Sequence, residues 1–230
     1  MNSNQPNITF PNSELKLTPT TQEINQIDIK VPSTPQDFGV GARFTVNVMS
    51  DDYISIILDA LASPTPKELK IQTDAVSTLI KGSERNILDY LYTVITKIAA
   101  SGHHVSATIL LSRGCPGEIT CQLPNRSLAT HSTNISLEKT GITVLAQWSL
   151  YPLFDDRQTA FSHMDDIYRA IDFAKDKGTY HRSTHFVTEL KGDLAQVLET
   201  IAMGWMLVGQ TVQHVTSHTT LSINSPTMAF

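Results

Sequence analysis

The chain has 230 residues, a length that fits one large domain or two small ones. It carries 17 Lys and Arg against 22 Asp and Glu, a formal net charge of -5, and no stretch dominated by basic residues, so we do not expect it to bind nucleic acid. No apolar run approaches the roughly 18 residues of a membrane-spanning helix, and no signal-peptide pattern follows residue 1, so we expect a soluble, cytoplasmic protein without membrane insertion.

Residues 1–38 are rich in Asn, Ser, Thr, Pro and Gln. Their few apolar residues follow neither the helical nor the strand period. A segment of this kind cannot bury enough apolar surface to offset the entropy of ordering it. We therefore predict a mostly disordered N-terminal extension.

A regular pattern begins at Gly39. Residues 42–49 alternate apolar and polar side chains, as a half-buried strand does. The next residues, from Ser50, are typical of a helix N-cap with an acidic first turn. They predict a helix with one apolar stripe, formed by Ile54, Ile57, Leu58 and Leu61.

The following residues complete a six-element unit. Two strands are predicted at 69–74 and 76–81, then a helix capped near Ser83 that stops at Gly102, and a last strand at 104–112. The order β-α-β-β-α-β is that of a ferredoxin-like fold.

The remainder of the chain repeats this unit at a shift of 110 residues. The shift aligns Thr78 with Thr188 and Gly82 with Gly192 without gaps. We therefore predict an α+β protein made of two tandem ferredoxin-like βαββαβ modules with antiparallel sheets. The boundaries are an extension at 1–38, modules at 39–118 and 141–228, and a linker at 119–140.

The alternation also predicts which side chains face the helices. Thr78 and Thr188 fall on the apolar face of their strands, where a buried hydroxyl needs a partner, either a nearby carbonyl or a small polar ligand between helix and sheet. The opposite sheet face is mostly polar and uncharged, which favours an interface. Because such faces are commonly covered by another sheet, we expect a homodimer.

Four strings in the two repeats resemble the YkoF family: SDDYIS at 50–55, TDAVSTLIKGS at 73–83, GCPG at 114–117 and NSP at 224–226. The resemblance extends over about residues 39–227. It implies a tandem of ferredoxin-like modules, usually dimeric, with one pocket per module that binds thiamine or its hydroxymethylpyrimidine precursor, and no catalysis. It also makes a thiamine-precursor transporter a candidate partner.

A pocket for an aminopyrimidine needs a carboxylate or carbonyl, a hydroxyl or amide donor, and apolar walls. Residue types that suit this need, at the positions indicated by the resemblance, are Met49, Asp51, Asp52 and Thr78 in the first module and Trp148, Phe154, Asp155, Asp156, His185 and Thr188 in the second. The aspartate pairs could equally serve the helix dipole. Ala75 stands where the family pattern has a histidine, whereas the second repeat keeps His185, so we expect unequal pockets with the tighter one in the second module.

Three other interpretations stay open. An enzyme would use Cys115 as nucleophile with His104 or His131 as base, although nothing in Gly-Cys-Pro-Gly lowers a thiol pKa and Cys115 aligns with Ser225. A metal site would gather histidines without Cys, Asp or Glu at ligand spacing, and the candidates are His103, His104, His214 and His218. The third is an interaction module that binds no small molecule. We expect no cofactor, no metal and no disulfide between Cys115 and Cys121.

Overall fold

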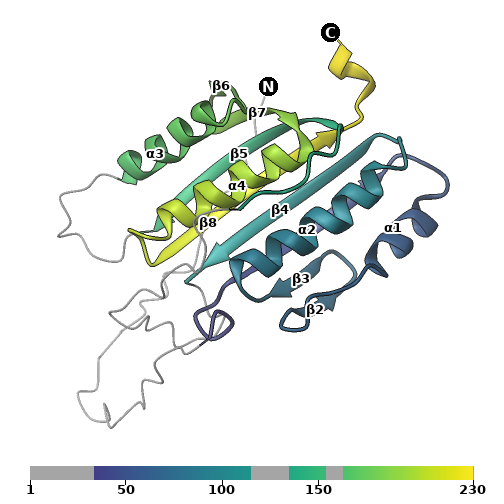
Figure 1. Ribbon diagram of the computed structural model, residues 1–230, viewed down its shortest axis with the longest axis horizontal. Helices are drawn as coiled ribbons and strands as arrows, with labels where there is room; N and C mark the ends of the chain where they lie inside the picture. The colour runs from purple at the N-terminus through teal and green to yellow at the C-terminus, as the bar shows by residue number, and fades with distance from the viewer. Residues whose placement is uncertain (1–33, 115–134, 154–162, 230) are drawn as a thin grey trace, which may run out of the picture. The chain divides into compact units, whose positions relative to one another are not determined.

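The computed structural model describes residues 34–114, 135–153 and 163–229. Within these residues the elements follow the predicted order twice, which confirms the α+β tandem (Figure 1). The first module consists of β1 (Gly41–Val48), α1 (Tyr53–Leu61), β2 (Lys70–Thr73), β3 (Thr78–Lys81), α2 (Glu84–Ala99) and β4 (Val105–Arg113). The second consists of β5 (Thr143–Leu153), α3 (His163–Asp176), β6 (Tyr180–Thr184), β7 (Val187–Asp193), α4 (Leu194–Val208) and β8 (His214–Ile223), followed by a short 3-10 helix, Pro226–Ala229.

The strands of both modules form one continuous sheet. Its order is β2-β3-β1-β4-β8-β5-β7-β6, and all neighbours pair antiparallel. The join is the pairing of β4 with β8, which runs from Val105–Ile223 to Arg113–Val215. Alternation within each repeat predicts two four-stranded sheets but contains no information about this join.

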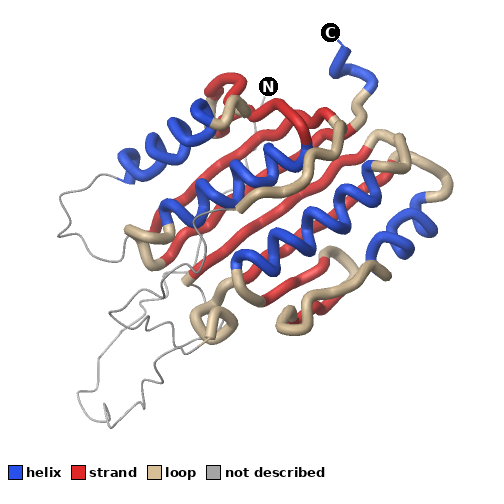
Figure 2. Tube along the Cα trace, in the orientation of Figure 1, coloured by secondary structure: helices blue, strands red, loops and turns tan. Residues whose placement is uncertain are grey.

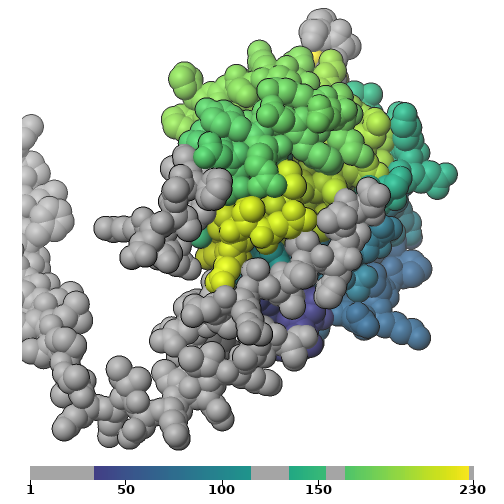
Figure 3. All heavy atoms as spheres, turned by 60° about the vertical axis from the view of Figure 1, so that its left-hand side comes forward, coloured from purple at the N-terminus to yellow at the C-terminus, as the bar shows by residue number. Residues whose placement is uncertain are grey.

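All four α-helices cover the same face of the sheet (Figure 2). As strand alternation predicts, every second residue of β4 faces the helices: Val105, Ala107 and Ile109 are at most 1% exposed. The alternating residues on the other face are half-buried or exposed. In Figure 3 the yellow residues near the C-terminus lie between the green residues of the second module and the purple and blue residues of the first.

The first strand of each module pairs with its two neighbours in the same register, whereas the edge pair β6–β7 has a bulge at Tyr180–Arg182 that β2–β3 lacks. Phe44 pairs with Thr78 between β1 and β3, and Trp148 pairs with Thr188 between β5 and β7. Equivalent positions therefore differ by 104 residues in the first strand of each module and by 110 in the later strands. This rule lets each side chain of one module be compared with its counterpart in the other.

Local capping explains where the second helix of each module starts. Ser83 accepts a hydrogen bond from the Asn86 amide through its side chain, as predicted for an N-cap. Asp193 does the same for the Ala195 amide at the start of α4. Gly102 follows α2 with a φ of +76°, a conformation that favours glycine.

The first helix differs from its prediction. It begins at Tyr53, so neither aspartate lies in its first turn, and the Asp52 side chain makes no capping bond. The expected apolar stripe is also split. Ile57 and Leu61 pack against the core, whereas Ile54 and Leu58 are 57% and 61% exposed.

Parts of the predicted extension and linker are folded. Residues 34–40 form turns that bury Phe38 and Val40 at the start of β1. Ile135, at the end of the predicted linker, is also buried in the core. Nearby, the Tyr92 hydroxyl donates to the Glu138 carbonyl at 2.8 Å. The folded body is therefore larger than the two repeats.

A buried ion pair lies where the modules meet. Arg113, at the end of β4, is 0% exposed, and its Nε lies 3.3 Å from Oε1 of Glu84 in the first turn of α2. Its Nη1 donates to the carbonyl of Gly209, the C-cap of α4 in the other module. A Cβ at Gly209 would lie 2.8 Å from this nitrogen, so glycine allows the close approach. The Phe38 ring centroid lies 5.1 Å from the guanidinium carbon.

Burial lowers the pKa of Arg113, and Glu84 opposes the shift. Arg113→Met should therefore be strongly destabilising, because it leaves the Glu84 carboxylate buried without its cation. We expect the free energy of unfolding to fall by about 3–5 kcal/mol, measured by urea denaturation. The double variant Arg113→Met with Glu84→Gln should regain part of this loss. Equal stability of Arg113→Met and the parent would contradict the assigned role.

Candidate ligand site

A cavity of about 280 Å³ lies between the sheet and the helices of the first module. It lies beside the start of β3, because β1 runs to Val48 but pairs with β3 only as far as Phe44, the partner of Thr78. Apolar side chains from β1, α1 and α2 form its walls: Phe44, Val46, Ile57, Leu61, Val94 and Ile98. The remaining lining comes from Thr45 and from residues 73–78, the turn between β2 and β3.

Two threonine hydroxyls provide polar groups in the lining of this cavity, one on the buried Thr78 and one on the exposed Thr73. Thr78 is 5% exposed, and its Oγ1 lies 3.0 Å from Oγ1 of Thr73 on the neighbouring strand. One of the two hydroxyls is the donor in this contact. The pair therefore keeps further donor and acceptor capacity, since each hydroxyl has one hydrogen and two lone pairs.

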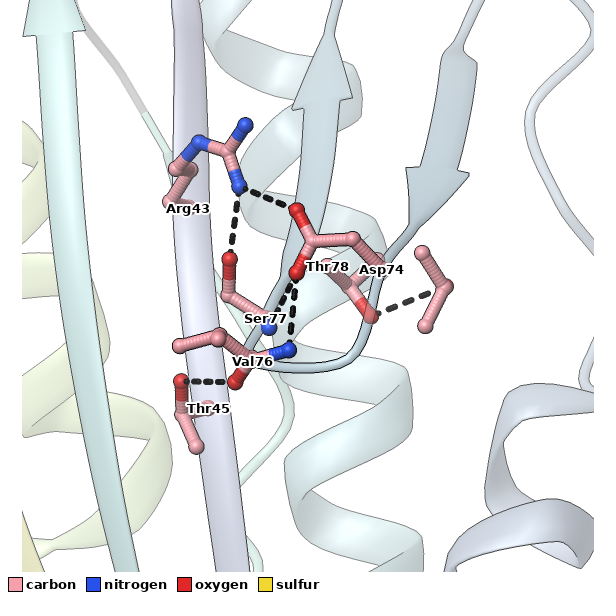
Figure 4. A network of polar contacts seen from close by, with 7 residues as sticks. Arg43, Thr45, Asp74, Val76, Ser77 and Thr78 are labelled. Carbon is pink, nitrogen blue, oxygen red and sulfur yellow. Dashed lines mark hydrogen bonds and ion pairs between the residues drawn. The ribbon is translucent and has the colours of Figure 1, made fainter.

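The turn at the cavity mouth is tied to β1 by Asp74 (Figure 4). One carboxylate oxygen accepts from the backbone N–H groups of Val76 and Ser77, at 2.8 and 2.9 Å. The other lies 2.9 Å from Nη1 of Arg43, which also donates to the Ser77 hydroxyl. The hydrogen bond from Arg43, followed by those from the two amides, lowers the pKa of Asp74 to about 2.

This arrangement suits a small flat ring with polar edges. The walls offer an apolar surface for the ring faces, and the two threonine hydroxyls can exchange hydrogen bonds with ring nitrogens or an amine. Its volume lies near the lower end of the roughly 300–1,000 Å³ of ligand pockets. A single heterocycle is therefore the right size for it.

The structure separates the predicted residues of the first module. Thr78 lines the cavity, whereas Asp51 and Asp52 are exposed before α1 and are absent from the lining. Met49 is 57% exposed and lines a different depression of about 440 Å³, on the helix-free side of the sheet. That depression also contains His104 and the ion pair between Arg182 and Glu189.

In the second module, Trp148 and Thr188 are brought together. They are register partners and both are buried, at 2% and 8% exposed. The Trp148 indole donates to the Ser217 hydroxyl at 2.8 Å. A Cβ at Gly204 would lie only 2.6 Å from the indole ring, so the glycine in α4 makes room for it.

The other predicted residues of the second module lie in an exposed turn or outside the described part of the chain. His185 is exposed in the turn between β6 and β7, with its ring centroid 6.0 Å from that of Phe186. Three predicted site residues lie outside the described residues: Phe154, Asp155 and Asp156.

Our sequence reasoning missed most of the first cavity. Thr73 and Asp74 lie in one of the strings that carry the family resemblance, so this signal could have found them. The apolar walls carry no such signal. Val94 and Ile98 have the same helical spacing as every other core residue of α2. They line a cavity only because β3 does not extend to the end of β1, and the helical spacing does not indicate this.

The described residues give little support to the alternative metal and enzyme sites. Within the ranges given above, no group of three or more His, Cys, Asp or Glu side chains could hold a metal. His104 is engaged with Ser222 across the β4–β8 join, at 3.2 Å. Cys115, Cys121 and His131 lie outside the described residues. No helix among those described combines the length and hydropathy needed to cross a bilayer.

Comparison with known proteins matches both modules. A family model described as “YKOF-related Family” matches residues 39–118 and 143–228. The chain is also 28% identical over 186 residues to a protein of Bacillus subtilis (strain 168) named “Putative HMP/thiamine-binding protein YkoF”. That alignment covers 81% of this chain and 90% of the relative.

At acidic pH the turn at the cavity mouth should lose the ion pair between Asp74 and Arg43. Because folding lowers the pKa of Asp74 from 3.8 to about 2, its charge stabilises the fold above pH 3.8, and this contribution is lost as the pH falls through 2. Asp74→Asn keeps an oxygen for the two amides but removes the charge facing Arg43. The difference in unfolding free energy between parent and variant should be constant near neutral pH and shrink between pH 4 and 2.

The matched control is Asp51→Asn, which removes an exposed carboxylate outside the cavity lining. Urea denaturation at a series of pH values measures both differences. A difference between the parent and Asp74→Asn that is independent of pH down to 2 would show that the Asp74 charge does not stabilise the turn.

Proposed function

Because the chain belongs to the YKOF-related family, we propose that it is a non-catalytic binding protein for thiamine or its hydroxymethylpyrimidine precursor, with one site in each module. The relative's printed name supports the ligand class. The family match to both modules, together with the shared register of β1 with β3 and of β5 with β7, supports one site per module.

The observation that carries the proposal is the Thr73–Thr78 hydroxyl pair inside an apolar cavity. The pyrimidine ring lies between the apolar walls, and its nitrogens and exocyclic amine exchange hydrogen bonds with the two hydroxyls. A thiazolium group is too large for the same space and extends through the mouth. Its positive charge is favoured by the exposed carboxylates of Asp51 and Asp52, which lie before α1 and outside the cavity lining.

In the second module Thr188 takes the place of Thr78, with Trp148 as an aromatic wall and His185 at the mouth. The sequence also assigns three further residues to this site: Phe154, Asp155 and Asp156. The differences between the two sets support unequal affinities, with the tighter site in the second module. Ligand delivery from a precursor transporter is the partnership we propose. A cytoplasmic location, on the receiving side of such a transporter, stays a prediction.

Thiamine titrations followed by calorimetry test the hydroxyl contacts. Thr78→Val keeps the shape of the side chain and removes the hydroxyl, so it should weaken the first site by about 0.5–1.5 kcal/mol, several-fold in affinity. Thr188→Val should do the same at the second site and leave the first unchanged. The control is Thr96→Val, which removes a hydroxyl on α2 that lies outside the cavity lining.

Undiminished binding by both Thr78→Val and Thr188→Val would show that these threonines are ordinary core residues. Absence of any heat with thiamine and with hydroxymethylpyrimidine would refute the proposed function itself. In that case the interaction module becomes the better interpretation.

We also propose that the chain forms a homodimer through the helix-free face of the sheet. This face carries half-buried serines, threonines and histidines, and also exposed Tyr151 and Leu110, side chains that are enriched or tolerated at interfaces. Sedimentation at micromolar concentration should give twice the chain mass of 25.4 kDa. A mass close to that of one chain would contradict the dimer.

A further inference from the structure

The turn between β6 and β7 presents an unusual aromatic residue. Phe186 is 94% exposed, and its φ is +70°. A positive φ is costly for a residue with a bulky side chain, by roughly 1–2 kcal/mol. Because the ring is exposed, its packing does not offset this cost in free energy.

Repeat equivalence indicates where this ring lies relative to a ligand. The counterpart of Phe186 is Val76, which is 78% exposed and lines the mouth of the first cavity. A hydroxyl on the first strand of each module donates to the carbonyl at this position, Thr45 to Val76 at 3.1 Å and Ser149 to Phe186 at 2.9 Å. The backbone at Phe186 is thus held at the same place in its module as the mouth of the cavity in the other.

The two turns differ in how strongly they are tied to the sheet. In the first module, Asp74 binds two amides of the turn and pairs with Arg43. The equivalent positions in the second module hold Thr184 and Gln147, which cannot form an ion pair. Ser77, which accepts from Arg43, is replaced by Val187. Among the described residues, the second turn therefore lacks the ion pair that holds the first turn to its neighbouring strand, although Ser149 still donates to the Phe186 carbonyl.

We propose that Phe186 is an aromatic cap for the second module, which stacks on a planar heterocycle bound beside Thr188 and Trp148. This inference rests on the proposed function and adds a residue that determines affinity at one of its two sites. Offset stacking between aromatic rings adds roughly 0.5–1.5 kcal/mol beyond the area buried. The adjacent His185 ring, tilted by 45° to Phe186, extends the same aromatic surface.

Because the φ of Phe186 is strained, a substitution can remove the side chain without destabilising the fold, and it then tests the role of the ring in binding alone. Phe186→Gly places the residue that best tolerates φ > 0 at this position and removes the ring. We expect a melting temperature no lower than that of the parent, together with a roughly three- to tenfold weaker second site for thiamine. Phe186→Tyr, which retains the ring, should bind like the parent.

Tryptophan fluorescence is sensitive to the second site, because Trp148 belongs to that proposed site, whereas Trp205, the other tryptophan of the chain, lies beside Ile87 and Leu91 of the first module and stays the same in every variant. Titration with thiamine, with calorimetry alongside, gives the affinity of each site. Val76→Gly is the matched control at the other turn and should leave the second site unchanged.

The possible results distinguish failure of the aromatic cap from failure of the proposed binding function. Parent-like affinity of Phe186→Gly at the second site overturns the cap while the proposed function stands. If Phe186→Gly is poorly folded, Phe186→Asn, a residue that also tolerates positive φ, gives the same test. If the parent itself binds neither thiamine nor hydroxymethylpyrimidine, the proposed function fails and the cap fails with it.

Discussion

The pairing of β4 with β8 is the constraint on which the rest of this structure depends. In an isolated module of this topology the last strand is an edge, with a row of unpaired backbone N–H and C=O groups. Here each edge satisfies the other along Val105–Arg113. Because both modules then share one sheet, their helices cover one face of it, and none of the described helices lies on the other face (Figure 2).

The same join explains the buried charge of Arg113. Once β4 and β8 are neighbours, α2 and α4 lie close together over the join, and the end of β4 lies between the start of α2 and the end of α4. A guanidinium is tolerated at that position because Glu84 opposes its charge and the negative end of the α4 dipole provides a carbonyl. An apolar side chain could fill this space, but it would not link the ends of both helices.

The two modules place different side chains on one shared backbone plan. Phe44 and Val94 line the first cavity, whereas the equivalent positions in the second module hold Trp148 and Gly204, a larger ring with a glycine that accommodates it. The turns differ in the same way, since one is held by a carboxylate with a pKa of about 2 and the other carries a strained, exposed phenylalanine. Duplication followed by such exchanges provides a physical route to two sites of unequal affinity.

The sequence by itself determined the elements of each module, the repeat and the family, because strand alternation, helical spacing and the residues at Ser83 and Gly102 are properties of neighbours along the chain. It also placed Thr78 and Thr188 on the buried face of their strands. Only the tertiary structure decided that the two sheets are one, that Ile54 and Leu58 face outward, and that Thr73 and Asp74 line the first cavity while Met49 lies on the other side of the sheet. Those outcomes depend on contacts between residues far apart in the chain, such as Val105 with Ile223 and Arg43 with Asp74, and no local period encodes which distant strand or turn a side chain will meet.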